Sequence, residues 1–256
     1  MAAAGRIWLS TGFYGCFLLL TGMALLAGPV AFWYLRWGKK YTPAVAVRTI
    51  IWFYGWLWTR IFMTFTPVTV RGCDRKFPEP CIITPNHQSF FDSYCIGFVP
   101  VTNLVFVVRA WPFKIPFYHW YMRKAEYINS EEMSGGEVLA KARQAIASGA
   151  SLVVFPEGTR SRTGELGRFH SGAFSLAVAC NVPVLPLCLD STGRFLRRGE
   201  YFPRKSEVRV TALDPVYPEA FLAHGDAAHM AMRREVKRRM QAVLDAGQGS
   251  TEKLCR

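Results

Sequence analysis

The sequence predicts an α/β domain, built on a mixed and mostly parallel sheet flanked by helices, with an N-terminal transmembrane or interfacial helical element. Two observations support this fold class. Short apolar runs alternate with helical runs from residue 67 onward, and residues 7–35 contain no charged side chain. A chain of 256 residues has room for one such domain and a membrane element, but not for two large domains.

Strands are expected where short runs are rich in apolar and β-branched residues, at 68–71, 81–84, 104–108, 152–155, 184–189 and 208–213. Helices are expected at 91–98, 136–147 and 172–179, with a last one at about 227–246. We therefore divide the chain into membrane-anchoring helices at 1–66 and the α/β domain at 67–256.

The uncharged stretch 7–35 lies between Arg6 and Arg36 and is a candidate transmembrane helix. A continuous helix of that length would measure about 44 Å, against a bilayer core of about 30 Å, so we expect a break at Gly28-Pro29. A cleaved signal peptide is the alternative. The apolar run is long for one, which favours an uncleaved anchor.

Basic residues follow the candidate span, at Arg36, Lys39, Lys40 and Arg48. The positive-inside rule then places the α/β domain on the cytoplasmic side. The expected location is the cell (inner) membrane. Residues 49–66 form a second apolar stretch, dense in Trp and Tyr and interrupted by Arg60. This composition is typical of an interfacial or re-entrant helix, and a buried core helix is the alternative.

The overall charge favours a membrane partner. A net charge of +13 combined with 51% hydrophobic residues suits an anionic membrane surface. Nucleic acid is not expected as a partner, because zinc-finger and RNP-type motifs are missing and the aromatic residues cluster in the N-terminal apolar region. The seven cysteines include no C-x-x-C pair, which favours reduced, buried thiols.

The candidate catalytic residues lie in the stretch 81–92, where an apolar run ends in a turn carrying His87, followed five positions later by Asp92. His has an unperturbed pKa close to neutral pH, so it suits a general base. A carboxylate on its second ring nitrogen would fix the tautomer and stabilise the imidazolium. His87 and Asp92 are therefore candidates for a base and the residue that orients it.

Two later stretches add to this pattern. Residues 151–161 read Ser-Leu-Val-Val-Phe-Pro-Glu-Gly-Thr-Arg-Ser, and residues 181–189 form another apolar run with two prolines. Together with Asn86-His87-x4-Asp92, they resemble the motifs of the glycerolipid acyltransferase family, the 1-acylglycerol-3-phosphate acyltransferases and their relatives. The resemblance covers roughly residues 65–215.

The resemblance implies an acyltransferase that moves a fatty acyl group from an acyl thioester to the hydroxyl of a lysophospholipid, with His87 as general base and Asp92 as its orienter. It implies substrate binding by Asn86 and by the turn Glu157, Gly158, Thr159 and Arg160, with Arg160 on the acceptor phosphate. A guanidinium fork matches a phosphate, and Gly158 lets the backbone come close. A salt-bridged turn is the alternative for Glu157 and Arg160.

Arg109 and Lys114 stand where the family has a basic residue followed by Ile-Pro, and both are expected to bind substrate. The match is partial, because His119 stands where the family usually has a glycine and Asn129-Ser130 stand where an Arg is common. His170 likewise stands where a Lys is common. These departures weaken the match at the acceptor site. Lysophosphatidate stays the first expectation for the acceptor, and a lysolipid with a zwitterionic or amino-acid head group is the alternative.

No Gly-x-Ser-x-Gly motif occurs, so the hydroxyl is expected to attack the thioester directly, with backbone amides near the His87 turn as donors to its oxygen. No cofactor and no metal are expected. The acyl donor is acyl-CoA or acyl carrier protein, both of which are anionic. Two alternatives remain: a non-enzymatic lipid-binding membrane protein, and a zinc hydrolase, which lacks convincing further ligands because His224 and His229 are distant in sequence.

Overall fold

The computed structural model describes residues 3–116, 118–197 and 199–252, which form one seven-stranded sheet with the strand order β1-β7-β6-β2-β5-β3-β4. Its strands are β1 (Val68–Arg71), β2 (Ile82–Pro85), β3 (Leu104–Val108), β4 (Ile128–Asn129), β5 (Ser151–Val154), β6 (Val184–Asp190) and β7 (Val208–Ala212). The β6–β7 pair is antiparallel and the other strand pairs are parallel. The predicted mixed, mostly parallel sheet is confirmed.

The helices are α1 (Ala3–Trp33), α2 (Pro43–Phe65), α3 (Asp92–Cys95), α4 (Tyr118–Lys124), α5 (Gly135–Ala147), α6 (Gly172–Cys180), α7 (Thr192–Phe195) and α8 (Ala228–Glu252). Short π or 3₁₀ segments are η1 (Tyr34–Gly38), η2 (Ile96–Phe98), η3 (Trp111–Lys114) and η4 (Pro218–Ala227). The helices expected from the sequence are present. Helix α5 starts at a capping box in which Ser134 and Glu137 bond each other's backbone, which fixes its first turn.

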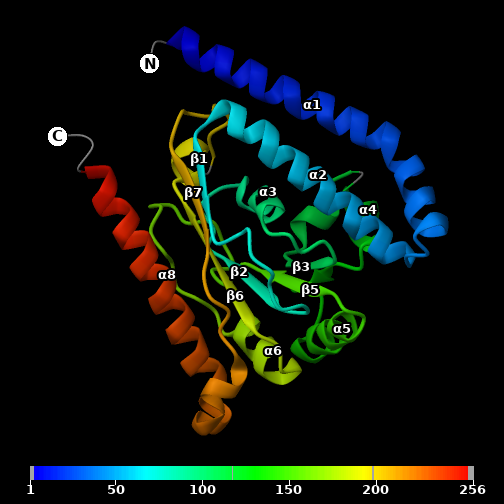
Figure 1. The fold of residues 1–256 in the computed structure, drawn as a ribbon, viewed down its shortest axis with the longest axis vertical. Coiled ribbons are helices and arrows are strands. Elements are labelled where there is room, and N and C mark those ends of the chain that lie inside the picture. Colours follow the sequence, from blue (N-terminus) through cyan, green and yellow to red (C-terminus); the bar gives the residue numbers. More distant parts are fainter. Residues whose placement is uncertain (1–2, 117, 198, 253–256) are drawn as a thin grey trace.

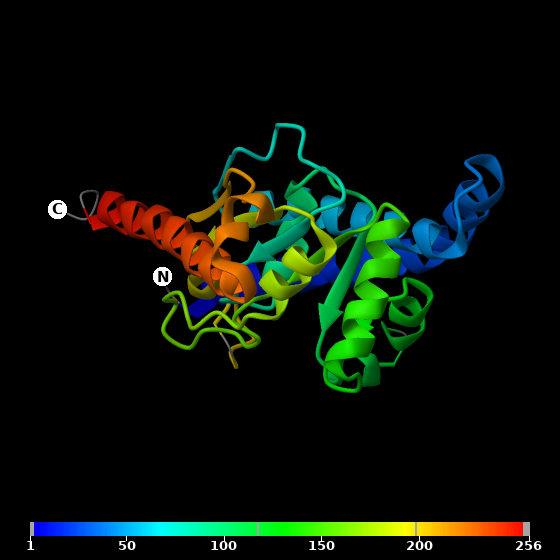
Figure 2. The same cartoon turned by 90° about the horizontal axis from the view of Figure 1, so that it is seen from below.

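Two apolar layers cover the two faces of the sheet. Alternate strand residues point to opposite faces, so Ile83 and Leu185 join α1, α2 and α3 in one core, whereas Ile82 and Leu152 join α5, α6 and α8 in the other. Figure 1 shows α1 and α2 running side by side on one side of the sheet and α8 on the other. In both views the described chain ends lie at the end of the molecule opposite α5 (Figure 2).

Helix α1 is docked on the α/β domain along its first half. The Phe13 ring is 1% exposed and packs against Trp58, Phe91 and Phe195, with ring centroids 5.0–5.6 Å apart. On the outer side Trp8 is 78% exposed. Within the described residues, α1 and η1 form the one helical segment long and apolar enough to cross a membrane, which by itself is weak evidence of a span.

The expected break at Gly28-Pro29 is wrong. Helix α1 contains Pro29 and ends only at Trp33, where the π-helical segment η1 takes over. Proline removes one main-chain hydrogen bond and usually kinks a helix, but the helical turns on both sides keep this segment continuous. The chain then reverses through residues 39–42, and α2 starts at the N-cap Thr42, whose side chain accepts a hydrogen bond from the Val45 amide.

Helix α2 buries one face in the core and exposes the other. Trp58 and Phe62 are buried among aromatic side chains, while Phe53 and Met63 are exposed. The buried-helix alternative therefore describes one face of α2, and an apolar strip remains on the other. Figure 1 shows that this helix lies between α1 and the rest of the domain.

Arg48 is not a surface charge, although the positive-inside argument counted it as one. Its side chain is 2% exposed and donates to the Ala125 carbonyl (2.7 Å), the Asn103 side chain (3.2 Å) and Glu126 (3.0 Å). Burial lowers the pKa of this guanidinium from its ordinary value. Arg48 thus fastens α2 to the turn before β4, and the topology argument now depends on Arg36, Lys39 and Lys40.

Candidate active site

The predicted site residues follow neighbouring parallel strands. His87 follows β2, the segment 157–160 follows β5, and Arg109 follows β3. These strands are adjacent in the order β2-β5-β3, so their carboxyl ends meet at one edge of the sheet. Ligands of open α/β sheets bind at that edge.

His87 and Asp92 form a hydrogen-bonded pair. The Asp92 Oδ2 atom lies 2.8 Å from His87 Nδ1 and also accepts from the amides of Gln88 (2.6 Å) and Ser89 (2.7 Å). The Asp92 side chain is fully buried, and the turn between the two residues folds its carboxylate back under the imidazole. A carboxylate on Nδ1 favours the tautomer that keeps the proton there, which leaves Nε2 as the acceptor.

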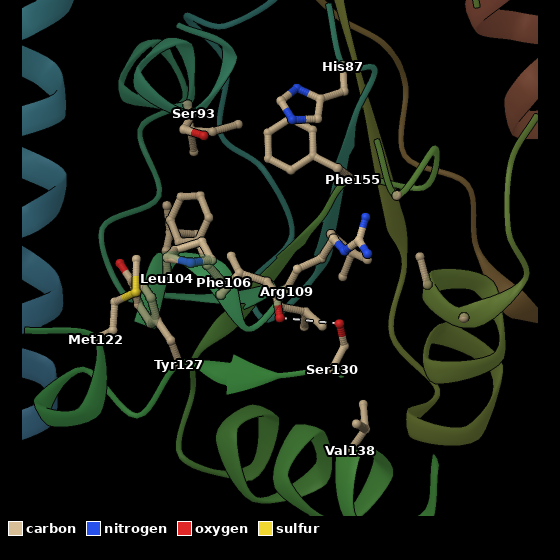
Figure 3. Close-up of a pocket in the computed structure, with 18 of the residues that line it drawn as sticks. His87, Ser93, Leu104, Phe106, Arg109, Met122, Tyr127, Ser130, Val138 and Phe155 are labelled. Carbon is tan, nitrogen blue, oxygen red and sulfur yellow. Dashed lines mark hydrogen bonds between the residues drawn. The ribbon is translucent and has the colours of Figure 1, made fainter. Parts of the chain in front are cut away.

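The imidazole of His87 lies at the wall of a large cavity of about 940 Å³, a size typical of ligand sites. Its ring packs on Phe155 with centroids 4.3 Å apart, as Figure 3 shows. Most lining side chains are apolar, among them Trp52, Leu104, Phe106, Met122, Tyr127, Val138 and Leu176. They come from α2, β3, α4, α5 and α6 and, for Tyr127, from the segment between α4 and β4, so the cavity extends from the His87 turn into the space between the helices.

Polar groups line the same cavity. They include Arg109, Gly158, Thr159, Arg160 and His170, whereas Lys114 is exposed and is not among the lining residues described. Gly158 has a φ of +67°, a backbone conformation that favours glycine, and a Cβ there would lie 3.4 Å from the His170 ring, in ordinary van der Waals contact. The structure thus brings Arg109 and the 158–160 turn together with His87.

Arg109 has a carboxylate partner that the sequence analysis did not single out. Its Nε atom lies 2.5 Å from Glu131 Oε1, and Glu131 Oε2 accepts from the Ala110 amide at 2.8 Å. The hydrogen bonds from Ala110 and Arg109 lower the pKa of the Glu131 carboxyl. Because the Arg109 side chain is 53% exposed, this ion pair contributes little to stability.

The polar side-chain atoms of Asn86 and Glu157 are hydrogen-bonded to main-chain groups of the protein. Asn86 is 1% exposed, and its amide group bonds both the N–H (2.7 Å) and the carbonyl (2.8 Å) of Leu189 on β6. Glu157 accepts from the amides of His87 (2.8 Å) and Gly167 (2.9 Å). The geometry favours a structural role for both residues over the substrate contact expected from the sequence.

The amides of the His87 turn are also occupied. His87 N donates to Glu157, and the amides of Gln88 and Ser89 donate to Asp92. These three N–H groups are therefore not available as the donors to the thioester oxygen that we expected at this turn.

Sequence reasoning missed Glu131, Gln88, Gly167 and the part of the cavity contributed by α2. Glu131 is adjacent to the Asn129-Ser130 departure, and Gln88 follows His87 directly, so proximity to the motifs was the signal available. The contribution of α2 depends on packing between distant segments, for which the sequence has no local signal.

The family model described as Acyltransferase matches residues 67–190, a segment that contains His87, Asp92 and the 157–160 turn. Residues 67–190, just under half of the chain, are therefore similar to the domain of this acyltransferase family.

Two similar proteins are the chloroplastic 1-acyl-sn-glycerol-3-phosphate acyltransferases of Brassica napus and Arabidopsis thaliana, which are 30% identical over 217 residues and 31% identical over 168 residues. These alignments include 79% and 63% of this chain, which spans only 60% and 47% of the length of those two relatives. The 1-acyl-sn-glycerol-3-phosphate acyltransferase of Pseudomonas aeruginosa is 26% identical over 200 residues, covering 73% of this chain and 71% of the relative.

Among solved structures, the fold matches the crystal structure of the 1-acyl-sn-glycerophosphate acyltransferase PlsC from Thermotoga maritima with a TM-score of 0.77. The match covers 97% of this chain and 98% of that one at 23% identity. At 97% coverage, the matched part of this chain includes α1 and α2 as well as the sheet.

Proposed function

We propose that this protein is an O-acyltransferase that moves a fatty acyl group from an acyl thioester to the free hydroxyl of a lysophospholipid, with 1-acyl-glycerol-3-phosphate converted to phosphatidate. The observation that carries this proposal is the His87–Asp92 pair at the wall of an apolar cavity that Arg109 and Arg160 also line. The names of the relatives from Brassica napus and Pseudomonas aeruginosa support the acceptor.

In the proposed reaction, His87 Nε2 takes the proton of the acceptor hydroxyl while its oxygen attacks the thioester carbonyl carbon. The tetrahedral intermediate then collapses, the carbon–sulfur bond breaks, and His87 gives its proton to the leaving thiolate, which regenerates the base and releases a free thiol. Asp92 stabilises the imidazolium between the two proton transfers. This scheme uses no protein nucleophile, no metal and no cofactor, and the donor is acyl-CoA or acyl carrier protein.

The cavity suits the two ends of these substrates. Its apolar part, lined by Leu104, Phe106 and Met122, accommodates an acyl chain, and its polar wall offers guanidinium groups to a phosphate. An acceptor phosphate at Arg109 would replace the carboxylate of Glu131.

Arg160→Ala is expected to raise the KM for a phosphate-bearing acceptor while changing kcat little, because a contact made equally in the ground and transition states is lost. A charge-assisted hydrogen bond is worth about 1.5–3 kcal/mol, which corresponds to roughly 10- to 150-fold in KM. Initial rates against acceptor concentration measure it. An unchanged acceptor KM would assign Arg160 to a structural role.

We also propose that the apolar outer face of α1 holds the protein on the cell (inner) membrane, with the catalytic domain in the cytoplasm. Trp8, Leu18 and Leu26 are 78%, 70% and 82% exposed on this helix, and Lys39 and Lys40 are exposed where it ends. An amphipathic surface of this kind combines apolar insertion with attraction to anionic lipids.

Lys39→Gln and Lys40→Gln are each expected to weaken binding to anionic vesicles about 5-fold, since a lysine near such a surface contributes about 1 kcal/mol. Co-sedimentation with phosphatidylglycerol-containing vesicles measures this. The matched control is Lys141→Gln, an exposed lysine on α5. Equal losses for Lys141→Gln and the other two variants would contradict the proposed membrane-facing surface.

The proposed function is tested by offering the purified protein a panel of lysolipids with acyl-CoA or acyl carrier protein donors. The lipid products are identified by their masses. Phosphatidate formation from lysophosphatidate is the expected result. A preference for a zwitterionic or amino-acid-containing lysolipid would change the acceptor and keep the acyltransferase. Lipid binding without any product would favour the non-enzymatic alternative.

A further inference from the structure

Residues 161–168, which we call the strap, make two hydrogen bonds to the turn that carries His87 (residues 86–92, the catalytic turn) and a third to Glu157. The Ser161 amide donates to the His87 carbonyl at 2.7 Å. The Gln88 side chain donates to the Gly164 carbonyl at 2.7 Å. The Gly167 amide donates to Glu157 Oε2 at 2.9 Å. The bonds are spread along the whole strap and end on the catalytic turn or on Glu157 beside it.

Glu157 connects the strap directly to the catalytic residue. Its Oε1 atom accepts from the His87 amide at 2.8 Å, while its Oε2 atom accepts from Gly167. The residue is 7% exposed, and burial raises the pKa of its carboxyl although the two hydrogen bonds lower it. Both main-chain groups of His87 are thus bonded, its N–H to Glu157 and its carbonyl oxygen to Ser161.

The approach of Gly167 to Glu157 leaves no room for a Cβ atom unless the Glu157 carboxylate moves. A Cβ at position 167 would lie 2.6 Å from Glu157 Oε2 and 3.5 Å from its carboxyl carbon. Real Cβ atoms do not approach other atoms to 2.6 Å, so even alanine at 167 displaces the carboxylate. The turn residues after Glu157 behave differently, since Gly158, Thr159 and Arg160 line the cavity.

We propose that Glu157, Gln88 and Gly167 are positioning residues, which hold the main chain of His87 so that Nε2 faces the substrate hydroxyl while Asp92 holds Nδ1. This inference rests on the proposed acyl transfer. It assigns Glu157 to the alignment of the base, in place of the acceptor contact expected from the sequence. A displacement of about 1 Å at a reacting group costs about 10²-fold in rate, so small shifts of this turn have large effects.

The test compares Glu157→Gln and Gly167→Ala with Glu165→Gln, an exposed glutamate on the same strap that serves as the matched control. The first two variants are expected to lower kcat about 10²-fold with little change in acceptor KM, equally for acceptors with and without a phosphate. The double variant is expected to be no worse than either single one, because both break the same contact.

The pH profile separates positioning from loss of folded protein. The acidic limb of kcat/KM reports the protonation of the free base, so Glu157→Gln is expected to move it, whereas a smaller folded fraction only lowers the whole profile. The same shift is expected in an NMR titration of the His87 ring, assigned with His87→Ala. Glu165→Gln is expected to leave kcat, the limb and the titration unchanged.

The positioning role is overturned if Glu157→Gln raises only the KM of phosphate-bearing acceptors. It is also overturned if the losses of kcat in Glu157→Gln and Gly167→Ala add in the double variant, or if the NMR titration curve of the His87 ring is the same in Glu157→Gln as in the unmodified protein. Absence of transfer by the unmodified protein would instead refute the proposed function. The NMR titration needs no turnover, so it still tests the strap in that case.

Discussion

Replacement of His87 by Ala is expected to lower kcat about 10²–10⁴-fold, because the acceptor hydroxyl loses the general base that we propose for it. The fold should remain intact, since the imidazole is partly exposed at the cavity wall and its one described hydrogen bond is the one to Asp92. Initial rates of phosphatidate formation measure the loss. His119→Ala, the same change at an exposed position on α4, is the control and should keep near-normal activity.

Asp92→Asn is also expected to lower kcat, because it changes the same His87–Asp92 pair. The carboxylate oxygen Oδ2 accepts three hydrogen bonds, from His87, Gln88 and Ser89, and an amide at this position removes the charge that stabilises the imidazolium. Turnover near the unmodified level in this variant would refute the dyad.

The second large effect is expected on stability, from Gly97→Ala. A Cβ at Gly97 would lie 2.7 Å from the Gly55 carbonyl carbon and 2.7 Å from the Trp56 amide nitrogen, both of which are main-chain atoms of α2. Main-chain atoms cannot move aside as a side-chain end does, so α2 must shift away from η2. Overpacking of this kind costs about 1–3 kcal/mol of unfolding free energy.

The measurement is the midpoint of thermal unfolding, with Gly55→Ala as the control. A Cβ at Gly55 meets only the Tyr94 carbonyl oxygen, at 4.0 Å, and alanine is the better helix former. We expect a lower midpoint for Gly97→Ala and an equal or higher one for Gly55→Ala. Equal midpoints for Gly97→Ala and the unmodified protein would contradict the close docking of α2 on η2.

The sheet was predictable because its apolar runs are short and bounded by turns, and β1 and β3 have the predicted residues. Strand β4 was missed, since two residues paired to Val107 and Val108 leave no periodic pattern. Helix α1 was expected to break at Pro29 and does not, because the surrounding turns are long enough to keep it continuous.

For the site, the residues that meet at the cavity were predictable from the sequence. The hydrogen-bond partners of individual polar side chains were not. His87 and Asp92 are five positions apart in one turn, so their contact is local. The partners of Asn86 and Glu157 are Leu189 and Gly167, and residue types alone do not show that these groups are already bonded. Arg48 looked like a juxtamembrane charge until its partner Glu126 was seen.

The most direct test of the proposed direct transfer is a single-turnover experiment with protein in excess over the acyl donor and saturating lysophosphatidate, which removes product release from the measured rate. We expect the unmodified protein to form phosphatidate with no acylated protein detectable by intact mass, and His87→Ala to react about 10²–10⁴-fold more slowly. Equal single-turnover rates for the two proteins, or an acylated protein that forms before phosphatidate, would contradict His87 as the base of a direct transfer.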